Sequence, residues 1–257
     1  MTTPTKATQP AANAAITRRR LLAVGAVIPI ASAGRAADIR GDMPWQEGQA
    51  ALAPVPSNAD AQQARYVFLD AAEAAFVEAA VSRLIPQDDL GPGALQAGVP
   101  FFIDRQLAGE YGSGARWYMQ GPWAKGEPTQ GWQTRMTPAG LYRAAIREID
   151  AAVNGEAHAV FAKLAAPDQD AWLHRLEEGK VQLSTVEAKA FFKLLWQNTL
   201  EGFWADPMYG GNRDMAGWKL IGFPGAHYDM SAELLQHGKP YPHPPVGLRG
   251  SPQWRQG

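Results

Sequence analysis

Apolar residues recur at helical spacing through much of the chain between residues 66 and 204. After Asp70, apolar side chains return every three or four residues as far as Ile85, and Pro86 then ends the pattern. Asp70 and Glu73 have the spacing of a capping box, in which each side chain accepts a hydrogen bond from the other residue's backbone amide. The pattern therefore predicts a helix that begins after Asp70 and ends before Pro86.

The same criterion predicts five more helices along the chain. In three of them proline or capping residues mark the start and glycine marks the end. They cover about 100–109, 138–154, 156–164, 168–178 and 188–202, and the last is opened by a second capping box at Ser184 and Glu187. No segment alternates apolar and polar residues as a half-buried strand would. We therefore expect a mainly α fold, an irregular helical domain with long loops rich in aromatic residues and glycine.

Two segments interrupt the helical pattern and combine aromatic side chains with glycine. The first, 110–136, holds five Tyr or Trp residues among seven Gly or Pro residues, and the second is 203–228. Loops of this length are uncommon in compact domains and usually have a function. Both segments are therefore candidate sites.

The N-terminal region is typical of an export signal rather than of a folded domain. Arginines 18–20 precede thirteen uncharged residues that end in the sequence Ala31-Ser32-Ala33. The paired Arg18 and Arg19, followed by Leu-Leu, favour the twin-arginine type, with a plain secretory signal as the alternative. Cleavage after Ala33 or Ala36 and retention of the signal as an anchor both remain open. The implied location is the periplasm.

Composition shifts divide the chain into four parts. We expect a twin-arginine signal peptide at 1–37, a flexible linker at 38–65, a helical domain at 66–237, and a Pro-rich tail at 238–257 that is extended and peripheral. The stretch 21–33 is shorter than the roughly 20 apolar residues that a membrane-spanning helix needs.

Composition also limits the chemistry. The chain has no cysteine, which excludes disulfides, covalent c-type haem, cysteine-ligated iron–sulfur clusters and thiolate zinc sites. Its net charge of -1 gives no general attraction to nucleic acid. The five histidines show no paired metal-ligand spacing, and no Gly-x-Gly-x-x-Gly motif is present. We therefore predict no cofactor-binding or metal-binding residue in this chain.

Segment 201–225 allows two interpretations that composition does not separate. It is either a partner-docking loop whose shape is held by an Arg213–Asp214 pair, or an Ω-type loop packed on the helices. As a third and different possibility, a stand-alone periplasmic enzyme would have Asp206, Arg213 and Asp214 as its only plausible catalytic groups. Because aromatic residues and arginine are enriched at protein interfaces, the candidate interface residues are Trp117, Trp123, Trp204, Asp206, Tyr209, Asn212, Arg213, Asp214 and Trp218.

Two stretches of sequence resemble a known family. The run Gly-Phe-Trp-Ala-Asp-Pro-Met-Tyr-Gly-Gly-Asn-Arg-Asp-Met-Ala-Gly-Trp-Lys-Leu-Ile-Gly-Phe-Pro-Gly at 202–225 is similar to the signature of gluconate 2-dehydrogenase subunit 3. The run Phe-Ile-Asp-Arg-Gln-Leu-Ala-Gly-Glu-Tyr-Gly at 102–112 resembles the same family, as do the helix ending in Leu84-Ile85-Pro86 and the leader. The resemblance extends over about 66–230.

The resemblance implies a role as the small subunit of a membrane-associated dehydrogenase in the periplasm. A large flavoprotein subunit would hold FAD and oxidise the sugar acid, and a multihaem cytochrome c subunit would carry the electrons away. No catalytic residue of the family carries over to this chain, because the chemistry would lie in the flavoprotein. The small subunit would bring the export signal to the twin-arginine machinery and act as a structural partner of the flavoprotein. The substrate of the complex could equally be 2-ketogluconate, glucose or a polyol.

Overall fold

The computed structural model describes residues 65–249, apart from 125, 128, 133, 228, 229, 232, 234, 240 and 242. The predicted signal with Arg18 and Arg19, the linker up to residue 64 and the last eight residues of the tail lie outside the described residues. The prediction of a mainly α fold is confirmed, because the interpretable part is 52% helix. In the described part, β structure is limited to two isolated bridges, Asp88–Gly91 and Gly225–Val246.

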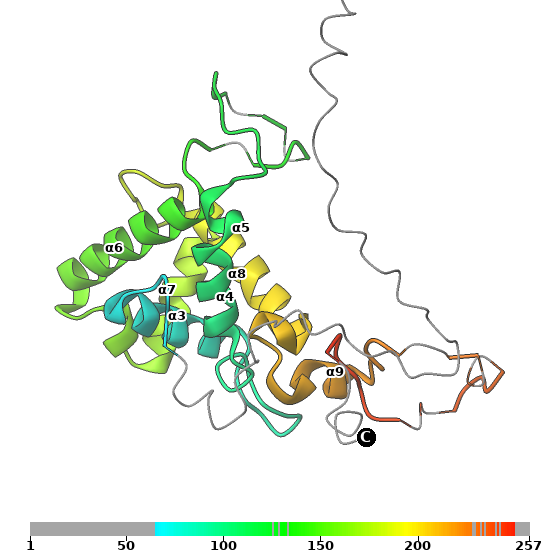
Figure 1. The fold of residues 1–257 in the computed structure, drawn as a ribbon. Helices are drawn as coiled ribbons and strands as arrows, with labels where there is room; N and C mark the ends of the chain where they lie inside the picture. Colours follow the sequence, from blue (N-terminus) through cyan, green and yellow to red (C-terminus); the bar gives the residue numbers. More distant parts are fainter. Residues whose placement is uncertain are drawn as a thin grey trace, which may run out of the picture. The chain divides into compact units, whose positions relative to one another are not determined.

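Seven α-helices and three 3-10 helices make up the described fold (Figure 1). The α-helices are α3 (Ala71–Leu84), α4 (Val99–Ala108), α5 (Glu110–Ser113), α6 (Pro138–Ala157), α7 (Ala166–Glu177), α8 (Ala188–Trp204) and α9 (Ala216–Ile221). The 3-10 helices are η1 (Phe161–Lys163), η2 (Pro207–Tyr209) and η3 (Arg213–Met215). Helix α8 packs against both α4 and α7, and α3 contacts the same two helices.

Local capping signals predicted two helices correctly. The Asp70 side chain accepts hydrogen bonds from the amides of Ala72 and Glu73, and the Glu73 carboxylate accepts one from the Asp70 amide. The capping box at the start of α3 is therefore confirmed, as is its end at Leu84. Helix α4 likewise has proline in its first turn and ends before Gly109, as predicted.

The predicted end of α6 at 154–155 is wrong, and so is the helix predicted over 156–164. Helix α6 continues to Ala157, where His158 takes the left-handed conformation and donates its amide to the Asn154 carbonyl. The chain then turns back because the Phe161 ring is fully buried and its amide donates to the Asp150 carboxylate at 2.8 Å. Only the short η1 forms at this point.

The second predicted capping box is also wrong. Helix α8 begins at Ala188, and Glu187 occupies the N-cap position without a side-chain hydrogen bond. The amides of Ser184 and Thr185 donate instead to the carboxylate of Glu148 on α6. A carboxylate from another helix has therefore replaced the local cap.

Four aromatic rings form the centre of the core. Phe76 lies 4.7 Å from Phe161 and 6.2 Å from Phe191 between ring centroids, and Tyr142 meets Phe191 edge-on at 5.4 Å. All four side chains are fully buried. Because they come from α3, α6, η1 and α8, their packing joins the helices into one core.

A buried amide links three helices on one side of this core. Asn198 of α8 accepts a hydrogen bond from the Tyr111 hydroxyl at 2.9 Å and donates one to the Tyr142 hydroxyl at 3.1 Å. Burial raises the pKa of Tyr111 to about 12 and raises the pKa of Tyr142 further. Both hydroxyls therefore stay protonated at neutral pH and keep α5, α6 and α8 together.

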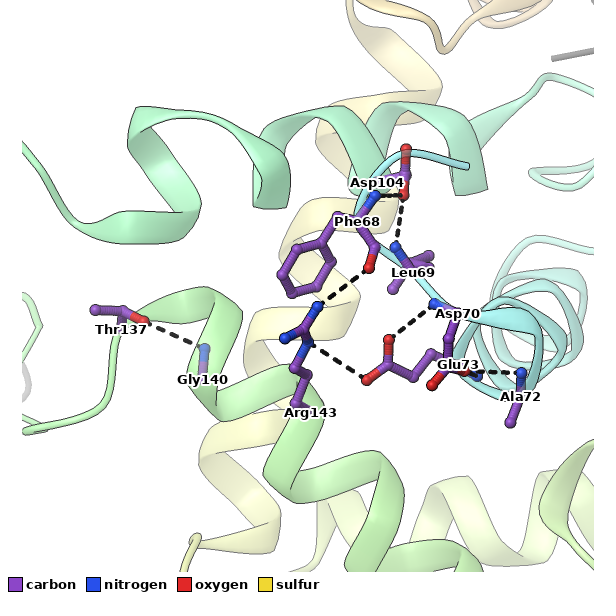
Figure 2. Close-up of polar contacts among 9 residues, drawn as sticks. All are labelled: Phe68, Leu69, Asp70, Ala72, Glu73, Asp104, Thr137, Gly140 and Arg143. Atoms are coloured by element: carbon purple, nitrogen blue, oxygen red, sulfur yellow. Dashed lines mark hydrogen bonds and ion pairs between the residues drawn. The ribbon is translucent and has the colours of Figure 1, made fainter. Parts of the chain in front are cut away.

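A buried carboxylate holds the segment that leads into α3. Asp104 of α4 is 1% exposed and accepts three backbone hydrogen bonds, from Val67 and Phe68 at 2.8 Å and from Leu69 at 2.9 Å. Figure 2 shows the bonds from Phe68 and Leu69. The negative charge strengthens these bonds, since charge-assisted hydrogen bonds are stronger than neutral ones.

Arg143 of α6 reaches the same segment from the other side. Its guanidinium lies 4.3 Å from the Phe68 ring centroid, donates to the Phe68 carbonyl at 3.3 Å and pairs with Glu73 at 3.6 Å (Figure 2). Helices α3, α4 and α6 are therefore joined through residues 67–70.

We expect Asp104→Ala to lower the free energy of unfolding by about 3 kcal/mol, because it leaves three backbone amides without their charged acceptor. Asp104→Asn should lower the free energy of unfolding by less. Its amide oxygen can still accept hydrogen bonds from the backbone, whereas its NH₂ group would face a backbone N–H, donor against donor. Urea unfolding measures both, with the exposed Asp89→Ala as the matched control. Equal stability of the Asp104→Ala and Asp89→Ala variants would contradict this role.

The ion pair between α3 and α7 gives a pH-dependent prediction. The Arg83 guanidinium donates two hydrogen bonds of 2.7 Å to Asp170, and this holds the pKa of that carboxyl below its ordinary value of 3.8. A lowered carboxyl pKa stabilises the fold above the unfolded-state pKa, and the contribution is lost as the pH falls through the folded-state pKa.

Arg83→Ala should therefore reduce the unfolding free energy by about 1 kcal/mol near neutral pH. The deficit relative to wild type should persist down to the unfolded-state pKa of 3.8 and shrink only below it. Urea titrations at about pH 7 and about pH 3 measure this difference. A deficit of the same size at both pH values would rule out the linkage, and exposed Arg147→Ala serves as the control.

Candidate partner-binding loops

One buried side chain closes segment 202–225, which runs from the last turn of α8 through η2, η3 and α9. Asn212 is fully buried and left-handed, with φ 45° and ψ 41°. Its amide donates to the Ala205 carbonyl at 2.8 Å, and its oxygen accepts from the Gly217 amide at 2.9 Å. Asn212 therefore connects the end of α8 to the start of α9, across η2 and η3.

Backbone contact accounts for two of the glycines in this segment. A Cβ atom on Gly211 would lie 2.1 Å from the carbonyl oxygen of Gly202, and one on Gly217 would lie 2.4 Å from that of Phe203. No side chain fits at either position without moving the backbone of α8. The segment is therefore seated directly on the last turn of α8.

The two tryptophans of the segment are joined by a hydrogen bond from one side chain to the backbone carbonyl of the other. Trp218 is 6% exposed, and its indole N–H donates to the Trp204 carbonyl at 2.8 Å. The Trp218 ring meets Phe223 edge-on at 5.2 Å, and Trp204 meets Phe203 edge-on at 5.0 Å. The side chains of Asn212 and Trp218 are both buried and form their hydrogen bonds within the segment. At these two positions the geometry therefore favours the packed Ω-type loop.

Asp206 fastens part of the C-terminal tail to this segment. Its carboxylate accepts from the Met208 amide at 2.9 Å and from the Leu248 amide at 2.6 Å. Val246 is 4% exposed and donates its amide to the Pro224 carbonyl at 3.1 Å. At these positions the tail is packed against the domain, which corrects the prediction that it is peripheral.

The remaining candidates of this segment lie nearer the surface. Tyr209 is 46% exposed and Asp214 is exposed in a left-handed conformation. Arg213 is half-buried and donates its backbone amide to the Ala97 carbonyl at 2.8 Å. Its guanidinium carbon lies 6.0 Å from the Phe101 ring centroid, so the side chain is placed over α4.

The other aromatic loop, 114–136, has a packed base. Trp117 lies 5.6 Å from Tyr111 and 5.1 Å from Trp132 between ring centroids, and the Trp132 indole donates to the Met136 carbonyl at 2.8 Å. Trp123 is half-buried beside Gly121, whereas Tyr118 is 77% exposed. In Figure 1 this loop extends away from α5.

The structure does not bring the two loops into one site. Segment 202–225 meets the first residues of α4, where a Cβ atom on Gly98 would lie 3.1 Å from the Gly210 carbonyl oxygen. The 114–136 loop follows α5, which begins directly after the other end of α4. The ten residues of α4 separate the two by about 15 Å.

Three residues beside segment 202–225 were not predicted from the sequence. Tyr66 stacks on Phe101 with ring centroids 4.8 Å apart, and Arg105 follows Phe101 one helical turn later. The sequence does place Phe101 and Arg105 four residues apart, on one face of a helix. An aromatic residue and an arginine at this spacing are common in helices, so the spacing alone does not indicate a site.

Two further observations concern the described residues alone. They contain no group of three or more His, Asp or Glu side chains that could hold a metal ion. None of their helices combines the length and the apolar character needed to cross a membrane.

Comparison with known proteins gave one match. The family model described as gluconate 2-dehydrogenase subunit 3 matches residues 71–225. The matched range starts with the first residue of α3 and contains the 114–136 loop, segment 202–225 and all seven α-helices described above. No curated protein and no solved structure matches the chain.

The closure of the segment by Asn212 can be tested with two variants. Asn212→Gly removes the two side-chain hydrogen bonds but permits the left-handed backbone, whereas Asn212→Ala adds about 1 kcal/mol of backbone strain. We expect the opening free energy at the Gly217 amide to fall by about 2 kcal/mol in the glycine variant and further in the alanine variant. Hydrogen exchange of that amide measures it, with exposed Asn154→Ala as the control. Unchanged exchange in both variants would contradict the assignment.

Proposed function

The chain belongs to the gluconate 2-dehydrogenase subunit 3 family, and from this premise we propose that it is the non-catalytic small subunit of a periplasmic, membrane-associated, FAD-dependent complex of the gluconate 2-dehydrogenase type. The family name implies a subunit of a multi-subunit dehydrogenase. In the proposed complex a large flavoprotein subunit holds FAD and oxidises the substrate. A multihaem cytochrome c subunit takes the electrons, and this chain supplies the export signal and a structural partner for the flavoprotein.

The observation that carries the proposal is the family match over 71–225. The use of the polar groups in segment 202–225 supports a structural role. The Asp206 carboxylate accepts two backbone amides, and both polar atoms of the Asn212 side chain are bonded within the segment. Groups engaged in this way maintain a shape and are poorly placed to act on a substrate.

The leader sequence supports the export part of the proposal. Arg18 and Arg19 are separated from the apolar stretch only by Arg20, as in signals read by the twin-arginine machinery. That machinery moves folded proteins, so a flavoprotein already loaded with FAD could cross the membrane bound to this chain. A carrier of this kind needs a stable fold and a binding surface, and it needs no catalytic group of its own.

We expect the double change Arg18→Lys and Arg19→Lys to reduce the flavoprotein in the periplasm to background when the two chains are coexpressed. The physical reason is that a flavoprotein without a signal of its own depends on the signal of its partner. Periplasmic flavin fluorescence and immunoblotting of the cell fractions measure the distribution. The matched control is Arg40→Lys, which makes the same change outside the paired arginines. Full export of the flavoprotein with the double variant would remove the escort role.

A further inference from the structure

Two half-buried arginines flank the junction between α4 and segment 202–225. A Cβ atom on Gly210 would lie 3.0 Å from Nη1 of Arg105, and one on Gly98 would lie 3.3 Å from Nη2 of Arg213. A Cβ atom on Gly98 would also lie 3.1 Å from the Gly210 carbonyl oxygen. Both guanidinium groups are therefore presented from one backbone junction.

Aromatic rings surround the two charges. Tyr66 and Phe101 stack at an interplanar angle of 15°, Arg213 lies near the Phe101 ring, and Tyr209 precedes Gly210 with 46% of its surface exposed. We call the surface formed by Tyr66, Phe101, Arg105, Tyr209 and Arg213 the Arg105–Arg213 surface. Tyrosine and arginine are, with tryptophan, the residue types enriched among those that contribute strongly to protein interfaces.

Neither arginine of this surface forms an ion pair with a carboxylate of the described part of the chain, and Glu78, which lies beside Tyr66, accepts a hydrogen bond from the Tyr66 hydroxyl at 2.5 Å. Arg83, Arg116, Arg143 and Arg175 all form ion pairs with carboxylates. Arg105 and Arg213 form none with a described residue, although both are half-buried. A guanidinium that has lost part of its water gains from a bidentate carboxylate partner, because the fork of N–H donors matches the two oxygens.

We propose that the Arg105–Arg213 surface docks the large flavoprotein subunit through carboxylates on that partner, with the exposed Tyr209 as an aromatic contact. The inference rests on the proposed function, which supplies the partner, and deepens it by naming the surface and the charge of the partner's face. The chain as a whole has a net charge of -1, so the attraction to an acidic face is local to this surface.

The backbone of this surface is held in place before any partner arrives. The Arg213 amide is bonded to the Ala97 carbonyl, and Asn212 next to it is fully buried. Gly98 and Gly210 have φ values of 78° and 102°, which side-chain-bearing residues rarely adopt. Binding therefore requires little ordering of the backbone, which favours affinity.

The test uses the full chain coexpressed with its flavoprotein, with the variants Arg105→Ala and Arg213→Ala and the control Arg147→Ala. Arg147 is an exposed arginine of α6 and forms no ion pair with a described residue. Each surface variant should weaken the complex about tenfold, as removal of an interface arginine does. The dissociation constant, measured by biolayer interferometry at several salt concentrations, should also depend less on salt in the variants. Arg147→Ala should bind as wild type does.

Lysine variants and circular dichroism separate a loss of binding from a loss of folding. If an alanine variant loses helical signal, the Arg105→Lys and Arg213→Lys variants decide, because they keep the charge and lose the bidentate fork. Weaker binding with full helicity supports the surface. Wild-type affinity in both lysine and both alanine variants overturns the surface while leaving the proposed function standing, provided that wild type binds. If wild type captures no flavoprotein, the proposed function and this inference fail together.

One competing occupant is the chain's own segment 1–64, which ends just before Arg65 and contains acidic residues such as Asp60. Limited proteolysis of the isolated full chain separates this case. Faster cleavage within that segment in Arg105→Ala and Arg213→Ala, together with unchanged affinity for the flavoprotein, would assign the surface to the segment and overturn the inference.

Discussion

The arrangement of the helices depends on a single buried carboxylate. Asp104 turns three successive amides of the chain, Val67, Phe68 and Leu69, toward α4. With these amides held, Asp70 is placed to cap α3 and the Phe68 ring is placed under Arg143 of α6. One acceptor thereby holds the segment from which α3 begins and on which Arg143 of α6 rests. Asp104 also lies beside Arg105, so the same helix that carries the internal anchor also carries part of the proposed docking surface.

The positions of the two candidate loops follow from this arrangement of helices. Segment 202–225 rests on the last turn of α8 and on the start of α4, whereas the 114–136 loop follows the other end of α4 through α5. A partner that binds at one loop therefore meets a different set of helices from a partner that binds at the other. Within segment 202–225, the buried residues maintain the shape, and Tyr209 and Arg213 are left nearer the surface.

The sequence was sufficient where a signal and its effect lie within one helical turn. Asp70 with Glu73 and Pro100 with Gly109 marked α3 and α4 correctly. Prediction failed where a distant group competes with a local one: Glu148 takes the amides that a cap at Ser184 would need, and the burial of Phe161 prevents a helix after α6. In the same way, composition identified segment 202–225 but could not show that Asn212 and Trp218 bond to the end of α8. Arg105 was missed because only its contact with Gly210, about a hundred residues away, distinguishes it.

The contact of Gly211 with Gly202 has a consequence for how the signature at 202–225 should be interpreted. The identity of Gly211 follows from the space between two backbones, and that of Gly202 follows from the Phe102 ring, which a Cβ atom would approach to 2.8 Å. A chain that serves a flavoprotein with another substrate would need the same glycines to build the same junction. The glycines of the signature therefore report an architecture, and in the proposed complex the oxidised substrate has to be identified from the pocket of the flavoprotein.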